Sequence, residues 1–528
     1  MADPIYERQN HYINGAWVPS AGAPKSLDVT DSNTGKVIGR VPAGSAEDTN
    51  LAVKAAKGAL DAWAATPAAT RKDYLFKVLM SFQAKKAKGV EMLMKELGCT
   101  KAFAENVQVM FVDWHFGTLI AAADKIKWSE PAGNAVVVKE PVGVVGCITP
   151  WNYPLNQICL KIGAAVMAGC TVVLKPSEVT PSIAYLFAEA MDEAGVPAGV
   201  FNMVMGLGPE CGEALAEHPD VDMISFTGST RAARRISEVA SKTLKILKTE
   251  LGGKSAALML DDADLQATVP AFMGQLMNNT GQSCNALSRM LVPRSRYEET
   301  LGMCKTIAEG VKVGRSDDPS STIGPLVSNA QWERVESYLK KGIEEGARLV
   351  TGGPGKPPGL EDGYFVKPTV FADVDNKMTI AQEEIFGPVL SVIPYDTEEE
   401  GIKLANDTIY GLNNAVASSS PERALRVAGQ LKSGMVMVNG VNMDFNAPFG
   451  GYKQSGNARE WGLYGVDDFL ITKTINVPPE LYYKNEKSAS AAEASSLVQK
   501  IKSLALKPQV AYTVALLATL WGLSRRRS

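Results

Sequence analysis

The middle of the chain alternates between two hydrophobic patterns. Runs such as Val142 to Ile148 and Thr171 to Leu174 are continuously apolar or β-branched, which is typical of buried strands. The segments between the runs, such as Leu155 to Met167, have apolar residues at helical spacing. Strands that alternate with helices pair in parallel, so the pattern predicts an α/β sheet from Val142 to Leu251. A second α/β stretch is predicted from Ser255 to about Gly451.

The C-terminal end follows a different pattern. Residues 484–508 have the composition of a polar linker followed by a short basic amphipathic helix. The 14 residues from Val510 to Leu523 then carry no charge, and three arginines follow. We expect residues 509–524 to anchor the protein in a membrane with its body facing the cytosol, at the mitochondrial outer membrane or the peroxisome rather than the endoplasmic reticulum. At about 1.5 Å per residue the uncharged run reaches about 21 Å, so the alternative is an apolar helix packed on the body of a cytoplasmic protein or on a partner.

Composition and charge narrow the class of protein. With 528 residues, 45% apolar and 21% charged, the chain has ordinary globular values, and its length suggests two to four domains. The net charge of −3 argues against a nucleic-acid binder held by phosphate contacts. The seven cysteines include no CxxC pair, which favours a reducing compartment. The three histidines stand at no ligand spacing, so no metal site is expected.

Four stretches at or near strand ends carry candidate chemistry. Phe226 to Thr230 passes from a strand through a glycine into a helix, whose free N–H groups can face a phosphate. Val173 to Glu178 offers a lysine and a glutamate to ribose oxygens. Glu250 to Lys254 places a carboxylate beside two glycines, which allows close approach to a substrate. Asn279 to Cys284 presents a cysteine in a glycine-containing turn, and this cysteine is a candidate nucleophile.

Each stretch alone also has an ordinary structural explanation. Most strand–glycine–helix turns bind nothing, charged residues at strand ends are often solvated, and most lone cysteines are small buried residues. Together, however, the stretches resemble the aldehyde dehydrogenase superfamily of NAD(P)-dependent enzymes, over about Tyr12 to Val477. The motifs that carry the resemblance are, in order, Tyr12 to Gly15, Pro150 to Pro154, Lys175 to Glu178, Phe226 to Thr230, Glu250 to Lys254, Gly281 to Cys284, Glu383 to Pro388 and Pro448 to Gly451.

The resemblance implies a catalytic role for three residues. Cys284 matches the family nucleophile, which attacks the aldehyde carbon to form a thiohemiacetal and then a thioester. The side-chain amide of Asn152, with the backbone N–H of Cys284, matches the oxyanion hole. Glu250 matches the general base that activates water to hydrolyse the thioester. Its presence favours release of a carboxylic acid over transfer of the acyl group to coenzyme A.

The resemblance also implies a dinucleotide site. Lys175 and Glu178 match ribose contacts, and Ser229, which follows Gly228, matches a pyrophosphate contact. Glu178 would repel a 2′-phosphate, which favours NAD over NADP as the cofactor. The implied cofactor-binding residues are Thr149, Trp151, Lys175, Glu178, Gly228, Ser229, Leu251, Glu384 and Phe386.

The fold class implied by the resemblance is α/β, with a Rossmann-like dinucleotide-binding domain, an α/β catalytic domain and a β oligomerisation arm. The NAD-binding domain would comprise residues 1–123 and 142–252, the catalytic domain 253–452, and the arm 124–141 and 466–478. A homodimer or a homotetramer that assembles through the arm is therefore expected.

The leading hypothesis is NAD-dependent oxidation of an aldehyde to a carboxylic acid. The expected anchor makes a lipid-derived or other hydrophobic aldehyde the favoured substrate. A semialdehyde dehydrogenase or a coenzyme A-acylating dehydrogenase is the alternative enzyme. A non-catalytic scaffold on the same fold is disfavoured, because Cys284, Asn152 and Glu250 are all present.

Overall fold

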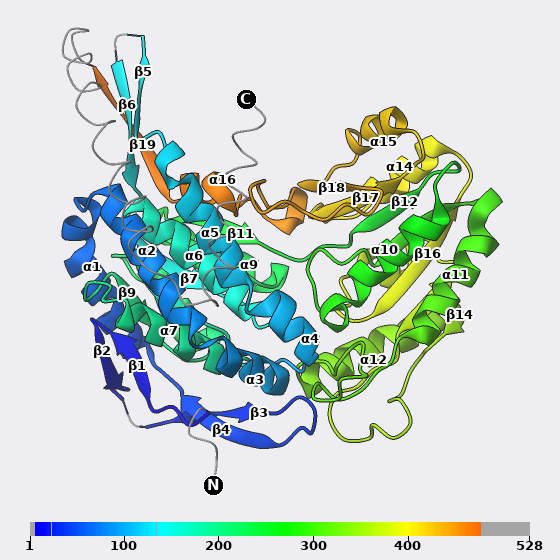
Figure 1. Ribbon diagram of the computed structural model, residues 1–528, viewed down its shortest axis with the longest axis horizontal. Coiled ribbons are helices and arrows are strands. Elements are labelled where there is room, and N and C mark those ends of the chain that lie inside the picture. The colour runs from blue at the N-terminus through cyan, green and yellow to red at the C-terminus, as the bar shows by residue number, and fades with distance from the viewer. Residues whose placement is uncertain (1–5, 23, 134, 477–528) are drawn as a thin grey trace, which may run out of the picture.

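The computed structural model describes residues 6–22, 24–133 and 135–476. Two large sheets, each covered by helices, form two lobes, and a three-stranded ribbon projects from one of them (Figure 1). The predicted alternation of strands and helices is present in both lobes. The fold class is therefore α/β.

The first sheet has the strand order β11 (Ile246–Glu250), β10 (Met223–Thr227), β7 (Val144–Ile148), β8 (Thr171–Lys175), β9 (Phe201–Met203), β1 (Asn10–Ile13), β2 (Ala16–Pro19). Strands β11 to β9 are parallel, and β1 and β2 add an antiparallel hairpin at one edge. In β7, Val145 and Cys147 face one core, whereas Val144 and Ile148 face another. Both faces of the strand are thus buried, which is why it is apolar throughout. The first core includes α2 (Ala68–Gln83), α5 (Phe111–Ala122), α6 (Pro154–Ala168) and α7 (Ser182–Glu193), and the second includes α1 (Ala46–Ala64), α8 (Glu213–Glu217) and α9 (Thr230–Ala240).

The second sheet has the strand order β14 (Arg348–Thr351), β15 (Thr369–Ala372), β16 (Val389–Tyr395), β13 (Arg289–Pro293), β12 (Ala256–Met259), β17 (Asn413–Ala417), β18 (Met435–Val438). All neighbours are parallel except β14 and β15. One face packs on α10 (Leu265–Met277) and α11 (Tyr297–Gly310), and the other on α12 (Asn329–Glu344), α13 (Thr379–Gln382), α14 (Glu398–Asn406) and α15 (Pro421–Ala428).

The projecting ribbon is antiparallel and consists of β5 (Ser129–Ala132), β6 (Ala135–Pro141) and β19 (Leu470–Asn476) (Figure 1). β19 pairs with β6 along its whole length and leaves Ile471 and Ile475 more than 40% exposed. The two segments predicted to form an arm, 124–141 and 466–478, thus contribute the strands of one ribbon. That this ribbon joins subunits stays a prediction. The described residues also form β3 (Ser26–Thr30), β4 (Val37–Pro42), α3 (Lys86–Glu96), α4 (Lys101–Phe103), the π-helix Ala104–Gln108 and α16 (Gly462–Asp467).

The two sheets present opposite ends to each other. Asn152, Gly228 and Leu251 follow the carboxyl ends of β7, β10 and β11 in the first sheet. Cys284 and Glu384 come shortly before the amino ends of β13 and β16 in the second sheet. All five residues line a single cavity. The carboxyl ends of parallel strands are where ligands of α/β sheets bind, so the cavity is the natural place for a site.

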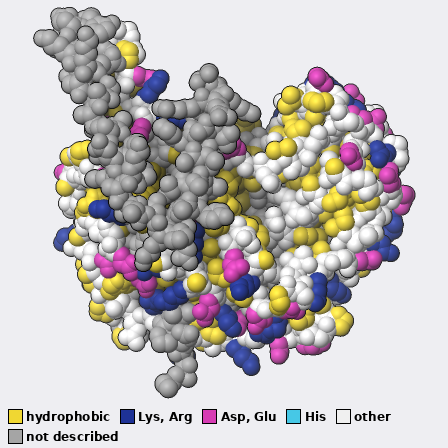
Figure 2. Space-filling view, viewed as in Figure 1, with side chains coloured by type: hydrophobic (Ala, Val, Ile, Leu, Met, Phe, Trp, Pro, Cys, Tyr) yellow, Lys and Arg dark blue, Asp and Glu magenta, His cyan; other side chains and the backbone are white. Residues whose placement is uncertain are grey.

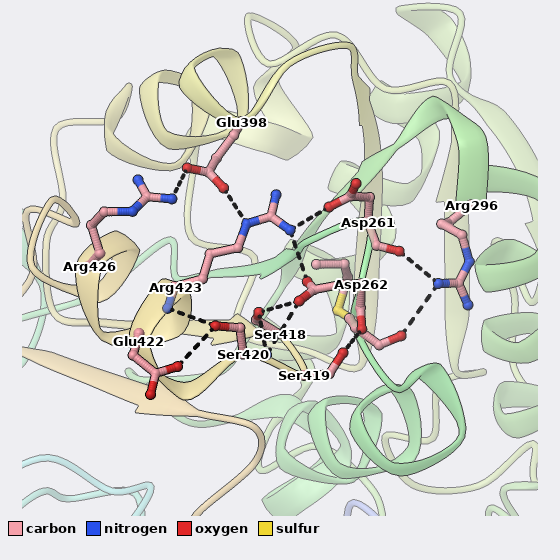
Figure 3. Close-up of polar contacts among 12 residues, drawn as sticks. Asp261, Asp262, Arg296, Glu398, Ser418, Ser419, Ser420, Glu422, Arg423 and Arg426 are labelled. Carbon is pink, nitrogen blue, oxygen red and sulfur yellow. Dashed lines mark hydrogen bonds and ion pairs between the residues drawn. The ribbon is translucent and has the colours of Figure 1, made fainter.

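The other end of the second sheet is tied together by a network centred on Arg423 in α15 (Figure 3). Its Nη1 donates to Asp261 Oδ1 at 2.6 Å and pairs with Asp262 Oδ1 at 3.1 Å, while its Nε donates to Glu398 Oε2 at 2.7 Å. Arg426 donates to the other oxygen of Glu398. The network joins the loop after β12 to α14 and α15, and its members satisfy one another within the chain.

Replacing Arg423 by Ala is expected to destabilise this lobe. The variant loses several charged contacts at once, so we expect a loss of about 1 kcal/mol and a fall in Tm of about 2 to 4 °C in scanning calorimetry. The matched control is Arg294→Ala, because Arg294 makes an isolated, exposed pair with Asp396. An equal shift in both variants would show that the network is worth no more than one surface ion pair.

The membrane prediction is corrected by the structure. None of the helices within residues 6–22, 24–133 and 135–476 is long and apolar enough to cross a membrane. The expected anchor, 509–524, and the linker and amphipathic segment, 484–508, lie outside the described residues. The uncharged run reaches only about 21 Å, which is short of a bilayer core of about 30 Å. The prediction of a membrane partner was therefore wrong, and the membrane localisation that depended on it is dropped.

The surface charge is mixed in sign. Figure 2 shows Lys and Arg side chains interspersed with Asp and Glu over the described part of this face. This distribution matches the net charge of −3. The exclusion of a nucleic-acid partner stays a prediction.

Candidate active site

The cavity between the two sheets has a volume of about 670 Å³. Eight of the twelve predicted site residues line it: Trp151, Asn152, Gly228, Ser229, Leu251, Cys284, Glu384 and Phe386. The other four lie at or after the strand ends that lead into it: Thr149, Lys175, Glu178 and Glu250. The structure therefore brings together motifs that are spread over more than 200 positions of the sequence.

Cys284 is presented by a strained turn. Asn279, Thr280 and Gly281 all have positive φ, at 52°, 57° and 74°. A Cβ on Gly281 would lie 2.2 Å from the carbonyl carbon of Gly387, so only glycine fits there. Left-handed backbone is unfavourable for a β-branched residue such as Thr280, and such strain is concentrated at functional sites.

Cys284 differs from the other cysteines in its exposure. It is the partly exposed one of the seven, and the remaining six are buried. Burial raises the pKa of its thiol, and the carboxylates of Glu384 and Glu250 raise it further. The resting side chain is therefore a thiol, and a nearby base is needed to make it a strong nucleophile.

Asn152 lies beside the cysteine turn with a free N–H. Its side-chain Nδ2 donates to the backbone oxygen of Gln282 at 3.0 Å. A primary amide nitrogen carries two hydrogens, so the second can donate to an oxygen in the cavity. This arrangement suits stabilisation of a negative oxygen on a carbon attached to Cys284.

Glu250 is a buried carboxyl group without a hydrogen-bond partner. It ends β11, is 2% exposed, and neither of its oxygens is bonded to another described residue. Burial raises the pKa of Glu250 well above its usual value, and the neighbouring carboxylate of Glu460 raises it further. Lys161, which bonds Glu460 at 2.5 Å, opposes this rise. A carboxyl group with a raised pKa is well suited to exchange protons near neutral pH.

The end of the cavity where a dinucleotide is predicted to bind contains two glycines without room for a side chain. A Cβ on Gly228 would lie 2.5 Å from the ring of Phe226, and one on Gly252 would lie 2.3 Å from the carboxylate of Glu384. Ser229 caps α9 by accepting from the N–H of Ala232 at 3.2 Å. The helix N-terminus behind Gly228 can thus be approached closely by an anion.

Charged side chains lie at the end of β8 and beside Gly252. Lys175 Nζ lies 2.8 Å from Glu178 Oε2 at the end of β8. Glu384 accepts from the N–H of Gly253 at 3.1 Å, and burial raises the pKa of Glu384 to about 7. The rings of Trp151 and Phe386 meet edge to face, with centroids 5.3 Å apart.

Sequence reasoning missed two parts of the site. The first is the buried pair of Lys161 and Glu460, which are 299 positions apart. A lysine within the apolar helix α6 was the available signal for half of this pair. The second is an aromatic wall at the Cys284 end, contributed by Phe111, Trp114, Tyr153, Phe445, Phe449 and Trp461. No local pattern marks these rings as neighbours.

Comparison with known proteins identifies the family to which the chain belongs. Residues 17–475 match the aldehyde dehydrogenase family. The chain belongs to the aldehyde dehydrogenase family. It is 47% identical to a 3-succinoylsemialdehyde-pyridine dehydrogenase of a Pseudomonas species over 465 residues, which are 88% of this chain and 97% of that protein. The recognition from motifs is confirmed, and the chain is an oxidoreductase of the aldehyde dehydrogenase type.

Solved aldehyde dehydrogenases share the fold. One from Pseudomonas syringae, a mutant solved with NAD+ and octanal, has a TM-score of 0.88 and 41% identity and covers 90% of this chain and 98% of its own. One from Mycobacterium tuberculosis, solved with NAD+, has a TM-score of 0.87 and 42% identity and covers 89% of this chain and 99% of its own. The predicted aldehyde dehydrogenase fold is therefore confirmed.

Proposed function

We propose that this aldehyde dehydrogenase oxidises an uncharged, hydrophobic aldehyde to a carboxylic acid, with NAD as the oxidant. The observation that carries the substrate class is the aromatic wall beside Cys284. Trp114 stacks on Phe445 with centroids 4.9 Å apart, and Trp461 lies 4.7 Å from Phe445 and 4.8 Å from Phe449. Such a wall favours an apolar or aromatic body on the substrate.

The charged groups of the cavity support the same conclusion. Among the described residues, the charged side chains that line the cavity are Arg334 and Glu384. Arg334 donates to the backbone oxygen of Glu384, so both lie at the end where Phe386 packs on Trp151. No described residue offers a cation to a substrate carboxylate at the aromatic end. A carboxylate buried there would be unpaired, which is costly.

The dinucleotide end fits NAD. The hydroxyls of Thr149 and Thr227 are buried without a partner among the described residues, and Lys175 stands beside Glu178 at a strand end. We propose that these groups and Ser229 hold the dinucleotide, with Glu178 disfavouring a 2′-phosphate. When bound, NAD supplies the hydride acceptor. The related structures solved with NAD+ support this assignment.

The residues of this chain then have distinct tasks. Cys284 passes its thiol proton to water in the cavity, and its sulfur bonds to the aldehyde carbon. The resulting oxygen anion accepts an N–H from Asn152 and the backbone N–H of Cys284. Loss of hydride leaves a thioester on Cys284. Glu250 takes a proton from water as the water attacks the thioester, and the carbon–sulfur bond breaks to release the acid.

A ring-bearing semialdehyde is the second candidate substrate. The Pseudomonas relative is named for a semialdehyde joined to a pyridine. The aromatic wall suits such a ring better than a small aliphatic semialdehyde with a free carboxylate. The coenzyme A-acylating alternative is disfavoured, because Glu250 offers a carboxylate as the base for water.

We also propose that the molecule is divided as the resemblance implies. The NAD-binding domain would comprise 1–123 and 142–252, and the catalytic domain 253–452. The ribbon of β5, β6 and β19 would join subunits in a dimer or tetramer, because its exposed Ile471 and Ile475 suit burial against a second copy.

A substrate series tests the proposed function. NADH formation by the purified protein is measured with octanal, phenylacetaldehyde and succinic semialdehyde at saturating NAD. We expect kcat/KM to be at least about 10-fold higher for the two uncharged aldehydes, because the aromatic end cannot pair a carboxylate. Trp114→Ala should reduce this preference. Faster turnover of succinic semialdehyde would contradict the proposed substrate class while leaving the dehydrogenase activity intact.

A further inference from the structure

We propose that Gln108 and Asn279 are positioning residues that clamp the backbone of Asn152, so that its side-chain amide meets the substrate oxyanion. The inference rests on the proposed function, because it assumes that an oxyanion forms on a carbon bonded to Cys284. It adds two residues to the site that do not touch the reacting atoms themselves.

The clamp consists of two amide donors on one carbonyl oxygen. The backbone oxygen of Asn152 accepts from Gln108 Nε2 at 3.0 Å and from Asn279 Nδ2 at 2.9 Å. A carbonyl oxygen has two lone pairs, so both are used. The Nδ2 of Asn152 is held by Gln282, which leaves one N–H to donate into the cavity. Three bonds therefore fix the direction of the remaining one.

The two donors leave their own oxygens unpaired. Gln108 is fully buried and Asn279 is 5% exposed. Gln108 Oε1 and Asn279 Oδ1 have no hydrogen-bond partner among the described residues. Burying an unpaired amide oxygen costs free energy, and an apolar side chain of the same shape would avoid that cost. The stability of the fold therefore does not explain why two amide side chains are buried here. Their bonds to the backbone of Asn152 do explain it, because they fix the position of that residue.

The clamp also connects two parts of the structure that border the cavity, the π-helix that ends at Gln108 and the turn that presents Cys284. Gln108 ends the π-helix Ala104–Gln108, and its neighbours Phe103 and Val107 line the cavity. Asn279 belongs to the left-handed turn that presents Cys284. The two bonds therefore fix the position of Asn152 relative both to the turn that carries Cys284 and to the part of the cavity wall next to Gln108. π-helical turns are often found at functional sites.

A double-mutant cycle tests the positioning role. Gln108→Met keeps the length of the side chain and removes the donor. We expect kcat to fall about tenfold and KM to change less than about twofold. A misplaced oxyanion donor reduces the stabilisation of the transition state but does not affect substrate binding. In the Asn152→Ala background the clamp has no side chain to direct, so Gln108→Met should cause no further loss of kcat. Equal losses in both backgrounds would overturn the proposal and indicate a general structural role.

A matched control and a second assay keep the outcome interpretable. Gln83→Met removes a half-buried donor, to Asp113, outside the site and should leave kcat unchanged. Hydrolysis of p-nitrophenyl acetate by Cys284 needs the same oxyanion donor but neither an aldehyde nor a dinucleotide. Non-additivity in ester hydrolysis without any aldehyde oxidation would support the clamp and contradict the proposed function. Additive losses in either reaction would overturn the clamp.

Discussion

Replacing Cys284 by Ala is expected to abolish NADH formation with every aldehyde, with a fall in kcat of about 10⁴-fold or more. The reaction requires a covalent bond between the substrate carbon and a protein atom, and alanine offers none. The measurement is the absorbance of NADH at 340 nm under saturating octanal and NAD. Binding of NAD, measured by quenching of tryptophan fluorescence, should be unchanged, because the substitution removes one atom from a side chain at the far end of the dinucleotide site.

The control for this variant is a buried cysteine away from the cavity. Cys304 lies in α11 within the core of the second lobe, and Cys304→Ala should retain activity. Iodoacetamide should label Cys284 faster than Cys304, because Cys284 is the partly exposed cysteine. Substantial activity in Cys284→Ala would contradict the nucleophile assignment, whichever substrate proves to be the best.

The parts of the fold that could be predicted are those with a local signature. Val142 to Ile148 is apolar at every position because β7 is covered on both faces, and this pattern is visible without a structure. The candidate site was predicted for a similar reason. Cys284, Glu250 and Gly228 each stand in a short motif whose order along the chain is specific. Glu250 and Gly228 lie at the ends of neighbouring parallel strands, β11 and β10, which meet at one edge of the first sheet.

The parts that could not be predicted depend on distant contacts. Trp114 and Phe445 stack although more than 300 positions separate them, and either ring alone resembles an ordinary core residue. Gln108 donates to Asn152 from the last residue of a π-helical turn, and no periodicity of the sequence indicates such a turn. The predicted substrate end of the site therefore depends on contacts between distant residues, whereas the residues of the predicted cofactor end lie mostly in local sequence motifs.

The membrane prediction shows the reverse error. The composition of a polar linker, a basic helix and terminal arginines favours a membrane anchor, whereas the short length of the uncharged run argues against one. A length of about 21 Å against a hydrocarbon core of about 30 Å is a physical constraint, and composition does not relax it. The rings of Trp114, Phe445 and Trp461 favour a hydrophobic substrate independently of any membrane anchor.

Glu250→Gln is expected to separate the two halves of the reaction. Formation of the thioester does not need this carboxylate as a base for water, so the first turnover should still produce about one NADH per active site as a burst. Steady-state turnover should fall about 10³-fold, because glutamine cannot take a proton from water. Stopped-flow absorbance measures the burst, and intact-protein mass spectrometry should detect the acyl group on Cys284. A burst that is absent would show that Glu250 also activates the thiol.

The pH profile provides the internal control for this assignment. Burial and the carboxylate of Glu460 raise the pKa of Glu250, and the basic form is the active one, so steady-state turnover should climb as pH rises through that pKa. Glu460→Gln removes the like charge and leaves Lys161 unopposed, both of which lower the pKa of Glu250. The rising limb should therefore move to lower pH in Glu460→Gln and disappear from the residual rate of Glu250→Gln. Glu213→Gln removes a partly exposed carboxylate that pairs with Arg235, and it should leave the rising limb at the same pH. A limb that persists in Glu250→Gln would assign the titration to another group, and the base would then have to be sought elsewhere in the cavity.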